Sequence, residues 1–437
     1  MICLMPQCGY LSETSRMIEL WRALDRRRTP VRMALHGGRH VGLVRAAGIP
    51  FDQVGPPMTA ERSLRLVRDS PGLGDVRQSV YTRAELVGYA QAEAEYLAAV
   101  GARAVVTGFT LTTLLSSRVA GVPLVTEHNG SWLPPLWETR SLPAPADPPW
   151  GWLRAVPRPV VRRLVNAAPP RVRWYCGDLN AVARQLGVAP VPSLAALTLG
   201  DVALLTEVPA VTGLPASAFT GWRPTDRRGY RDGTRLAVAG PIHARLPLPL
   251  PPEVEAFLAT PGPVVYVALT STPPALVRAV TAAVLAARPD VRVLVAGTVH
   301  EPSDLVPAGA APGAAPGAVL AGGVLPSQLV LPRVPLAVTT AGQGSLQTAM
   351  AAGTPVIGVP LQPEQDLNVV LLERLGAAVR VAPSAAGGRR MSATVRAALD
   401  SSRLRQGAAR VRAWYDAVDG PDAAAQVIER VAATGLP

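Results

Sequence analysis

Small and hydroxyl-bearing residues between two apolar runs form the most informative segment of the chain. The sequence AGQGS at 341–345 follows the run PLAVTT and precedes the run PVIGVP. A glycine turn that opens a helix presents backbone N–H groups and the positive end of the helix dipole to a ligand. Gly342, Gly344 and the hydroxyl of Ser345 would therefore suit a phosphate. The same residues could also serve only to close a loop.

A carboxylate and two amides follow the second apolar run. Glu364, Gln365 and Asn368 come shortly after Pro360, at the carboxyl end of the next predicted strand. Carboxylates accept hydrogen bonds and amides both donate and accept them, so this set suits the adjacent hydroxyls of a sugar. The carboxyl ends of parallel strands form one ligand-binding edge of a sheet. The two motifs together therefore predict a nucleotide-sugar site.

The segment resembles the donor-binding signature of the family 1 glycosyltransferases, which include plant and macrolide glycosyltransferases. The family pattern runs roughly His-Gly-Gly-x-Gly-Thr, then Ala-x-x-x-Gly-x-Pro, then Pro-x-x-x-Asp-Gln-x-x-Asn. The residues that fit it are Gly342, Gly344, Ser345, Ala349, Gly353, Pro355, Pro360, Gln365 and Asn368. Thr340 stands where the family has histidine, and Glu364 where it usually has aspartate. Thr340 cannot carry positive charge, so weaker stabilisation of a diphosphate is predicted.

The resemblance implies an inverting, metal-independent transfer of a sugar from a nucleotide-diphosphate sugar to a small, natural-product-like acceptor. The residues expected to hold the diphosphate carry hydroxyls or accessible backbone N–H groups: Ser271, Thr340, Gly342, Gly344 and Ser345. Glu364 and Gln365 are expected to bind the sugar hydroxyls. Val324 and Leu325 correspond to the base-binding segment of the family. A UDP- or TDP-linked sugar is expected as co-substrate, with no cofactor and no metal, since the sequence has no Asp-x-Asp pair.

A hydroxyl acceptor also needs a general base. The family commonly presents a histidine in its first turn, held by an aspartate from a later strand end. Here Gly9 is followed by Tyr10, and the later position falls on Thr107 and Gly108. Glu13, at the start of the first predicted helix, is the first candidate to replace that pair. It could equally stabilise the helix start through the helix dipole.

Two histidines are further candidates for the base. His128, in EHNGSW at 127–132, follows a predicted strand at 122–126, and Glu127 or Asn129 could orient it. His36 ends the second predicted strand. Either histidine could also be a hydrogen-bonded loop residue without a catalytic role.

The acceptor is expected near the same strand ends, on Tyr10, Asn129 and Trp132. Trp132 begins a segment, 132–174, that is rich in tryptophan, proline and arginine. Its aromatic rings could stack on a flat apolar acceptor. They could also pack under a long loop, or contact a membrane surface together with the arginines.

The elements that must position these residues alternate between strands and helices through most of the chain. This order predicts an α/β protein with parallel, doubly wound sheets. The resemblance implies two Rossmann-like domains facing a cleft, the GT-B fold. The expected boundaries follow the chain in order: an acceptor-binding domain at 1–240, a proline-rich linker at 241–262, a donor-binding domain at 263–415, and a last helix crossing back at 416–437. Helices are predicted over 192–199 and 395–417.

Composition narrows the classes of partner and compartment. The 437 residues carry a formal charge of +12, and the basic residues are all arginine. They are scattered and accompany no nucleic-acid-binding motif, so no nucleic-acid partner is expected. Three cysteines without metal-ligand spacing, an uncharged start and the absence of a clean apolar span predict a cytoplasmic protein without integral membrane association.

Two other functions remain open at this stage. A catalytically degenerate, glycosyltransferase-like auxiliary or binding protein would explain the missing histidine–aspartate pair and Thr340. A nucleotide-sugar epimerase of related fold would share the diphosphate site but would need no acceptor pocket.

Overall fold

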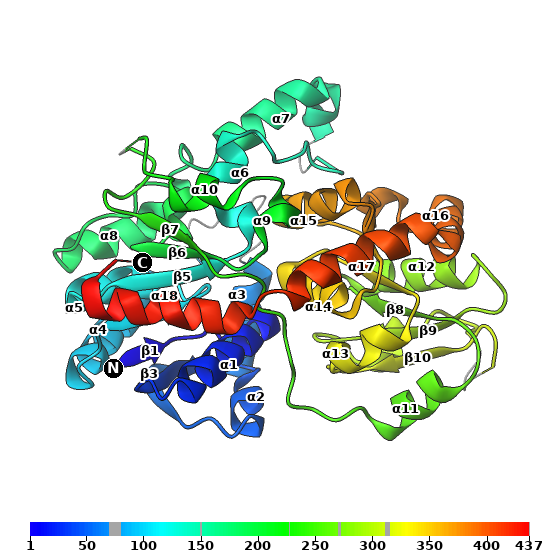
Figure 1. Ribbon diagram of the computed structural model, residues 1–437, viewed down its shortest axis with the longest axis horizontal. Coiled ribbons are helices and arrows are strands. Elements are labelled where there is room, and N and C mark those ends of the chain that lie inside the picture. Colours follow the sequence, from blue (N-terminus) through cyan, green and yellow to red (C-terminus); the bar gives the residue numbers. More distant parts are fainter. Residues whose placement is uncertain (70–79, 149–150, 227, 270–271, 311–314, 437) are drawn as a thin grey trace. The chain divides into compact units, whose positions relative to one another are not determined.

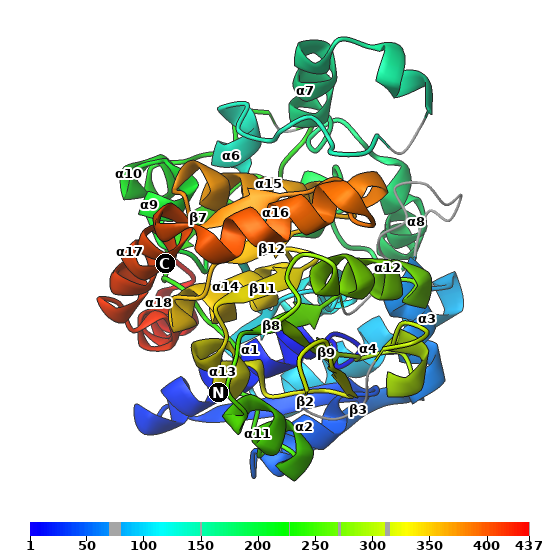
Figure 2. The same cartoon turned by 90° about the vertical axis from the view of Figure 1, so that its right-hand side faces the viewer.

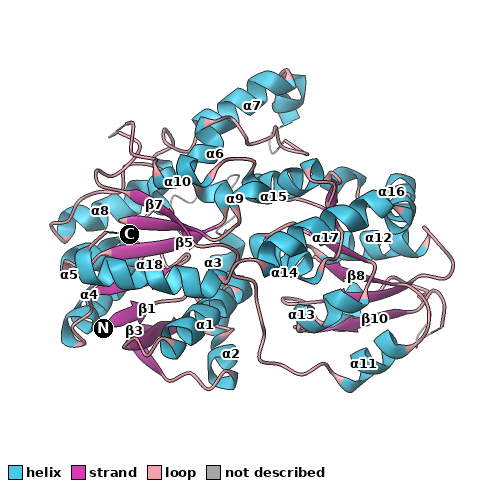
Figure 3. Cartoon of the chain, viewed as in Figure 1, coloured by secondary structure: helices cyan, strands magenta, loops and turns pink. Residues whose placement is uncertain are grey.

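The computed structural model describes the chain except for residues 70–79, 149–150, 227, 270–271, 311–314 and 437. The chain forms two compact units (Figure 1). The first comprises residues 1–142, 156–242 and 418–437, and the second comprises 143–155 and 243–417. In both units helices accompany parallel strands, as expected for an α/β protein (Figure 3).

The described residues of the first unit form a seven-stranded parallel sheet in the order β3-β2-β1-β4-β5-β6-β7. Its strands are β1 Ile2–Leu4, β2 Val31–Gly37, β3 Phe51–Met58, β4 Ala104–Thr107, β5 Leu124–His128, β6 Val202–Leu205 and β7 Arg235–Val238. Ile2 pairs with Val31 on one side and with Ala104 on the other. The chain therefore changes direction across the sheet between β1 and β4, and such switch points bind ligands at the carboxyl ends of their strands.

Helices make up much of the rest of the first unit. They are α1 Leu11–Arg26, α2 Val41–Ala46, α3 Ala60–Asp69, α4 Arg83–Ala99, α5 Thr113–Ala120, α6 Pro134–Glu138, α7 Arg158–Ala167, α8 Gly177–Gln185, α9 Pro209–Thr212, α10 Ala216–Thr220 and α18 Gly420–Thr434. The last helix packs beside α1 (Figure 1). Arg27, at the end of α1, pairs there with Asp422 and Glu429.

The second unit repeats this architecture. Its six-stranded parallel sheet has the order β10-β9-β8-β11-β12-β13 among the described residues. The strands are β8 Val264–Ala268, β9 Arg292–Ala296, β10 Val319–Gly322, β11 Leu336–Thr339, β12 Val356–Gly358 and β13 Ala378–Arg380. Its helices are α11 Pro252–Ala259, α12 Pro274–Leu285, α13 Ser327–Val330, α14 Gln343–Ala352, α15 Pro363–Arg374, α16 Arg389–Asp400 and α17 Ser402–Asp416. The switch point here lies between β8 and β11.

Each unit has its own hydrophobic core, built mainly from strands that are buried on both faces. In the first unit β1, β4 and β6 are buried along their whole length, and in the second unit β8, β9 and β11 are. Parallel sheets covered by helices on both faces require such continuous apolar strands. None of the described helices combines the length and the apolarity needed to cross a bilayer.

Three predicted elements were wrong in detail. The helix predicted over 395–417 is two helices, because Ser401 adopts an extended conformation and its side chain accepts a hydrogen bond from Leu404 N, capping α17. The helix predicted over 192–199 is only a 3-10 turn, Ala195–Leu197. The strand predicted at 122–126 is β5, which continues through His128, so this histidine belongs to the strand and does not follow it.

Candidate functional site

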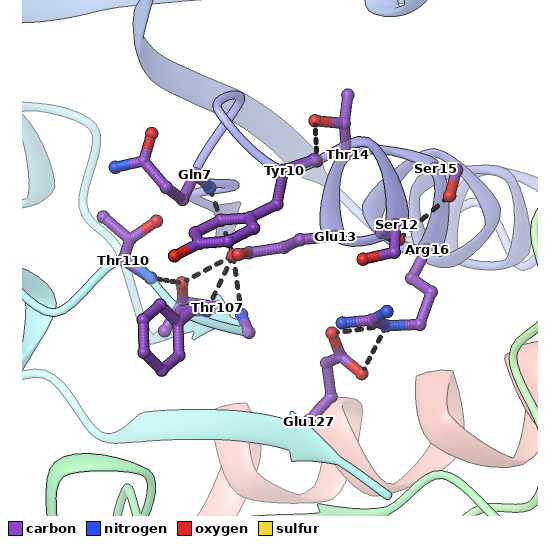
Figure 4. Close-up of polar contacts among 12 residues, drawn as sticks. Gln7, Tyr10, Ser12, Glu13, Thr14, Ser15, Arg16, Thr107, Thr110 and Glu127 are labelled. Carbon is purple, nitrogen blue, oxygen red and sulfur yellow. Dashed lines mark hydrogen bonds and ion pairs between the residues drawn. The ribbon is translucent and has the colours of Figure 1, made fainter. Parts of the chain in front are cut away.

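Glu13 lies at the switch point of the first sheet. Its Oε1 accepts hydrogen bonds from Gln7 N at 3.1 Å, after β1, and from Gly108 N at 3.1 Å and Phe109 N at 2.8 Å, after β4 (Figure 4). The helix α1 places Glu13 in its first turn. One carboxylate oxygen therefore joins the two loops that border the expected ligand-binding edge.

The second carboxylate oxygen of Glu13 takes no part in these hydrogen bonds. Oε2 is buried and has no hydrogen-bond partner among the described residues. Burial raises the pKa of Glu13 to about 7, although the hydrogen bonds from Phe109 and Gln7 lower it. A carboxyl group with a pKa close to neutrality is suited to accept a proton near pH 7.

A second carboxylate lies beside Glu13. A Cβ atom built on Gly108 would lie 2.7 Å from Glu127 Oε1 and 3.0 Å from Glu13 Cδ, so both carboxyl groups approach the same point and only glycine fits there. Arg16 Nε contacts both Glu127 oxygens, at 2.8 and 2.9 Å (Figure 4). Burial raises the pKa of Glu127, and the charge of Arg16 lowers it. Glu127 thus pairs with Arg16, and this pair was not predicted from the sequence.

Aromatic rings and hydroxyl groups surround the Glu13 loops. Tyr10 and Phe109 meet edge to face, with ring centroids 5.6 Å apart, and both are partly exposed. Thr107 and Thr110 donate hydrogen bonds to Met5 O, at 2.9 and 2.7 Å, and so fix the loop after β4 against the loop after β1. Tyr10, a predicted acceptor contact, is therefore placed next to Glu13.

The two histidine candidates are both buried. Burial lowers the pKa of His128 to about 3, and the charge of Arg16 lowers it further, so the ring is neutral at pH 7. His36 Nε2 lies 2.8 Å from Glu93 Oε1, and the His36 ring stacks on Tyr89 with centroids 4.1 Å apart. His36 thus lies between a buried carboxylate and a stacked tyrosine ring.

The other predicted acceptor contacts follow β5. Asn129 is buried and accepts a hydrogen bond from the Ser131 hydroxyl. Trp132 ends the adjacent 3-10 turn, Gly130–Trp132, and is partly exposed. Both come from the carboxyl edge of the first sheet, as does Glu13. Their contact with an acceptor stays a prediction.

The glycine turn of the second unit follows β11 at its switch point. The helix α14 begins at Gln343, so Gly344 and Ser345 lie in its first turn. Gly342, Gly344 and Ser345 are partly exposed, whereas Thr340 is buried. The exposed start of a helix at a switch point is a favourable place for a phosphate.

Ala341 adopts a left-handed conformation with φ of 63°. It stands where the resembled signature has its first glycine, a residue that adopts this conformation without strain. The turn is held by a hydrogen bond from Ala341 N to Thr339 Oγ1 at 3.0 Å. Gly358 on β12 leaves space beside the turn, since a Cβ there would lie 2.5 Å from Val369 Cγ2 and 3.1 Å from the Ala341 Cβ.

The predicted sugar-binding residues lie on a helix and not in a loop. Glu364 and Gln365 belong to the first turn of α15. Asn368 Nδ2 donates to Glu364 Oε1 at 2.6 Å and to Ala341 O at 3.2 Å. Gln365 Oε1 accepts from Leu361 N at 2.8 Å. Asn368 therefore couples the glycine turn to the carboxylate predicted to bind the sugar.

The sequence was compared with those of known proteins. No model of a protein family matches the sequence. A PGL/p-HBAD biosynthesis glycosyltransferase of Mycobacterium tuberculosis is 29% identical over 302 residues, which are 68% of this chain and 63% of the relative. A PGL/p-HBAD biosynthesis rhamnosyltransferase of Mycobacterium bovis is 27% identical over 345 residues, 78% of this chain and 70% of that protein. The alignment thus spans less than two thirds of the first relative.

Solved structures cover the whole chain. Glycosyltransferase VinC in complex with DTDP has a TM-score of 0.63 at 16% identity and covers 99% of this chain and 100% of its own. Spinosyn rhamnosyltransferase SpnG complexed with spinosyn aglycone has a TM-score of 0.60 at 16% identity, with 98% and 100% covered. The fold is GT-B. The fold class expected from the sequence is confirmed, and so is the resemblance to family 1 glycosyltransferases.

Within this GT-B fold the remaining predicted donor contacts lie in the second unit. Val324 and Leu325 follow β10. Val324 is partly exposed, whereas Leu325 is buried against Gly322. Ser271 lies outside the described residues. Among the residues that are described, no group of three or more histidine, cysteine, aspartate or glutamate side chains gathers in a way that could hold a metal ion.

One feature of this GT-B chain has no counterpart in the sequence motifs. Residues 143–155 lie between α6 and α7 in the sequence but belong to the second unit. Asp366 accepts hydrogen bonds from Ala146 N at 2.7 Å and from Arg380 Nε at 2.6 Å. Arg380 also donates to Ala144 O at 2.9 Å. The segment is therefore attached directly beside Glu364 and Gln365, by residues that follow them in the sequence.

Proposed function

We propose that the chain is a glycosyltransferase that moves a sugar from a nucleotide-diphosphate sugar to a hydroxyl group of a small, natural-product-like acceptor. The GT-B fold and the names of both curated relatives support this activity. The ligands of two structural neighbours, DTDP in VinC and spinosyn aglycone in SpnG, support a TDP-linked donor and an aglycone as the acceptor. A UDP-linked donor is the second choice.

The donor is proposed to bind the second unit. The N–H groups at the start of α14 and the hydroxyls of Ser345 and Thr340 would face the diphosphate, and Glu364 and Gln365 would bind the sugar hydroxyls. Donors arranged in advance around the leaving oxygen stabilise its developing charge, typically by about 3 kcal/mol for each donor. No protein metal ligand is needed in this scheme, because the N–H groups and hydroxyls would carry the charge of the departing diphosphate.

Glu13 is proposed as the general base. Its Oε1 is held by three backbone N–H groups, while Oε2 has no partner among the described residues and the pKa is raised to about 7. Oε2 would accept the proton of the acceptor hydroxyl while that oxygen attacks the anomeric carbon. The bond from the anomeric carbon to the diphosphate breaks in the same displacement, which inverts the configuration. This one arrangement carries the catalytic part of the proposal.

Glu13→Gln tests the base directly. The amide oxygen of glutamine can accept the same three N–H groups, so the loops should stay in place while the base is lost. We expect transfer to fall by at least about 100-fold, the usual contribution of a general base, with the dissociation constant of the nucleotide donor unchanged. In the wild type, kcat should rise with pH through about 7, as Glu13 loses its proton. Transfer at the wild-type rate by Glu13→Gln would remove Glu13 from the mechanism.

A non-catalytic, glycosyltransferase-like binding protein is the second candidate. The observation that favours it is the burial of Glu13, which is only 2% exposed to solvent. In that case Glu13 would only clamp the loops after β1 and β4. Nucleotide-sugar binding by calorimetry, combined with no transfer to any of a panel of macrolide, phenolic and polyketide acceptors, would support this second function.

The proposed compartment is the cytoplasm. Cys3, Cys8 and Cys176 are free and buried, and burial raises the pKa of the Cys3 and Cys176 thiols to about 11. Such thiols stay protonated, and free cysteines are typical of a reducing compartment. No nucleic-acid partner is proposed.

A further inference from the structure

Exposed apolar side chains concentrate in one short part of the chain. Nine large hydrophobic residues of the described chain are exposed, and three of them fall within 160–174 of the first unit: Val160, Leu164 and Trp174. The other six are spread over the rest of the sequence. Exposed apolar side chains are ordinary when they are scattered, but a cluster of them marks an interaction surface.

The helix α7 turns its apolar side outward. Val160 and Leu164 are one helical turn apart and therefore lie on the same face, 47% and 52% exposed. The opposite face is held down, since Asn166 exchanges hydrogen bonds with the backbone of Leu142 at 3.1 and 2.9 Å and Val161 is buried. In Figures 1 and 2 α7 stands out from the strands of its unit. A helix on a protein surface normally presents polar residues to solvent, so this face is prepared for a partner.

The stretch of sequence that contains α7 carries charge of a single sign. The stretch 148–177 contains no aspartate or glutamate and has six arginines: Arg154, Arg158, Arg162, Arg163, Arg171 and Arg173. Arg163 lies on the helix beside Leu164 and is exposed, and Arg171, Arg173 and Trp174 follow the helix, exposed as well. Long arginine side chains can bury their stems in an apolar layer while the guanidinium group stays at its surface.

We propose that α7 and residues 168–174 dock the chain on the surface of a membrane that contains anionic lipids. Val160 and Leu164 would enter the boundary between headgroups and acyl chains, and Arg163, Arg171 and Arg173 would meet the lipid phosphates. A protein partner is less favoured, because two aliphatic side chains on one helix provide far less than the roughly 1,200 Å² that stable protein interfaces bury. A membrane adds attraction for every arginine near its surface.

The proposal goes beyond the proposed transferase activity and does not depend on it. Its test uses the full chain and vesicles of phosphatidylglycerol and phosphatidylcholine, compared with vesicles of phosphatidylcholine alone, by co-sedimentation. We expect binding to the anionic vesicles only, with roughly five-fold weaker partitioning for each of Arg163→Gln and Arg171→Gln. Leu164→Gln should weaken it by about ten-fold or more, through the loss of apolar burial.

Matched controls separate this surface from general attraction of a basic protein. Val119→Gln removes an exposed aliphatic residue on α5, and Arg184→Gln an exposed arginine on α8. Both should leave partitioning unchanged, and every variant should keep the thermal midpoint of the wild type. Absence of vesicle binding, equal losses for the controls, or self-association that requires Leu164 in sedimentation equilibrium would each overturn the proposal. Arg163→Gln keeps the test valid if Leu164→Gln disturbs the helix.

Discussion

Glu13 should make the free energy of unfolding depend on pH, and comparison with Glu13→Gln separates its contribution from that of the other titrating groups. Burial raises its pKa from 4.5 to about 7, so folding favours the protonated form. The stability from this group is present in full below pH 4.5 and is lost as the pH rises through about 7. The shift corresponds to roughly 3 kcal/mol. Because Glu13→Gln does not titrate, its free energy of unfolding relative to the wild type should rise by about this amount between pH 4 and pH 8. A difference that stays constant over this range would contradict the raised pKa.

Ala341 offers a second test at the residue scale. A left-handed conformation costs an L-residue roughly 1–2 kcal/mol, whereas glycine adopts it freely. The greater chain entropy of unfolded glycine offsets about 0.5–1 kcal/mol of that gain. Ala341→Gly is therefore expected to raise the free energy of unfolding by up to about 1 kcal/mol. Ala351→Gly, on the helix α14, should lower it by about the same amount. Chemical denaturation of both variants would show opposite signs, and a loss of stability in both would mean that the turn is not strained.

Among the larger elements, the 143–155 segment is held partly by a buried ion pair and partly by Asp147, which accepts hydrogen bonds from Ser384 N at 2.7 Å and from the Ser384 hydroxyl at 2.8 Å. Asp366 and Arg380 are 2.6 Å apart, with side chains 6% and 15% exposed. Arg380→Met would remove the positive charge beside the buried carboxylate of Asp366, at a cost of roughly 3 kcal/mol. We expect faster amide exchange at residues 144–147 and a lower thermal midpoint. Arg333→Met, which breaks an exposed pair with Glu255, should cost less than about 1 kcal/mol. Equal effects of the two changes would show that the segment is held by other contacts.

The start of α18 is another element whose packing can be tested. A Cβ on Gly420 would lie 2.1 Å from Pro241 O, so Gly420→Ala must displace the helix start. Such overpacking typically costs about 1–3 kcal/mol. Exchange of amides at 422–434 should accelerate, because these residues form the helix that packs beside α1. Gly42→Ala on α2 meets no atom within 4 Å and should be neutral or stabilising. Unchanged exchange in α18 after Gly420→Ala would mean that this end of the helix is not anchored.

The sequence predicted the local elements of the fold and of the site well, for a physical reason. Buried parallel strands are continuous apolar runs, and a helix after a glycine turn is specified by residues that are neighbours in the chain. The predictions failed where distant residues decide the structure. The three N–H groups that hold Glu13 come from Gln7, Gly108 and Phe109. The 143–155 segment is bound by Asp366, Arg380 and Ser384. No spacing rule links these residues. One sequence signal could have indicated that Arg16 lies near the site: it comes one helical turn after Glu13 on α1.

For the molecule as a whole, the division into two units makes the proposed donor site testable without any acceptor. Each unit has a separate sheet and core, so a nucleotide that binds only the second unit should protect only that unit. Thymidine diphosphate at about 100 times its dissociation constant would stabilise the state that binds it by about 2.7 kcal/mol. We expect slower amide exchange around 340–346 and 364–366, with exchange in β1 and β4 unchanged. Ser345→Ala and Gln365→Ala, which alter partly exposed side chains, should weaken this protection. The exchange of the free protein should stay the same except at Leu361, whose N–H loses its bond to Gln365 Oε1 in Gln365→Ala. Protection confined to the loops after β1 and β4 would instead place the nucleotide in the first unit, and the assignment of donor and acceptor sites to the two units would have to be reversed.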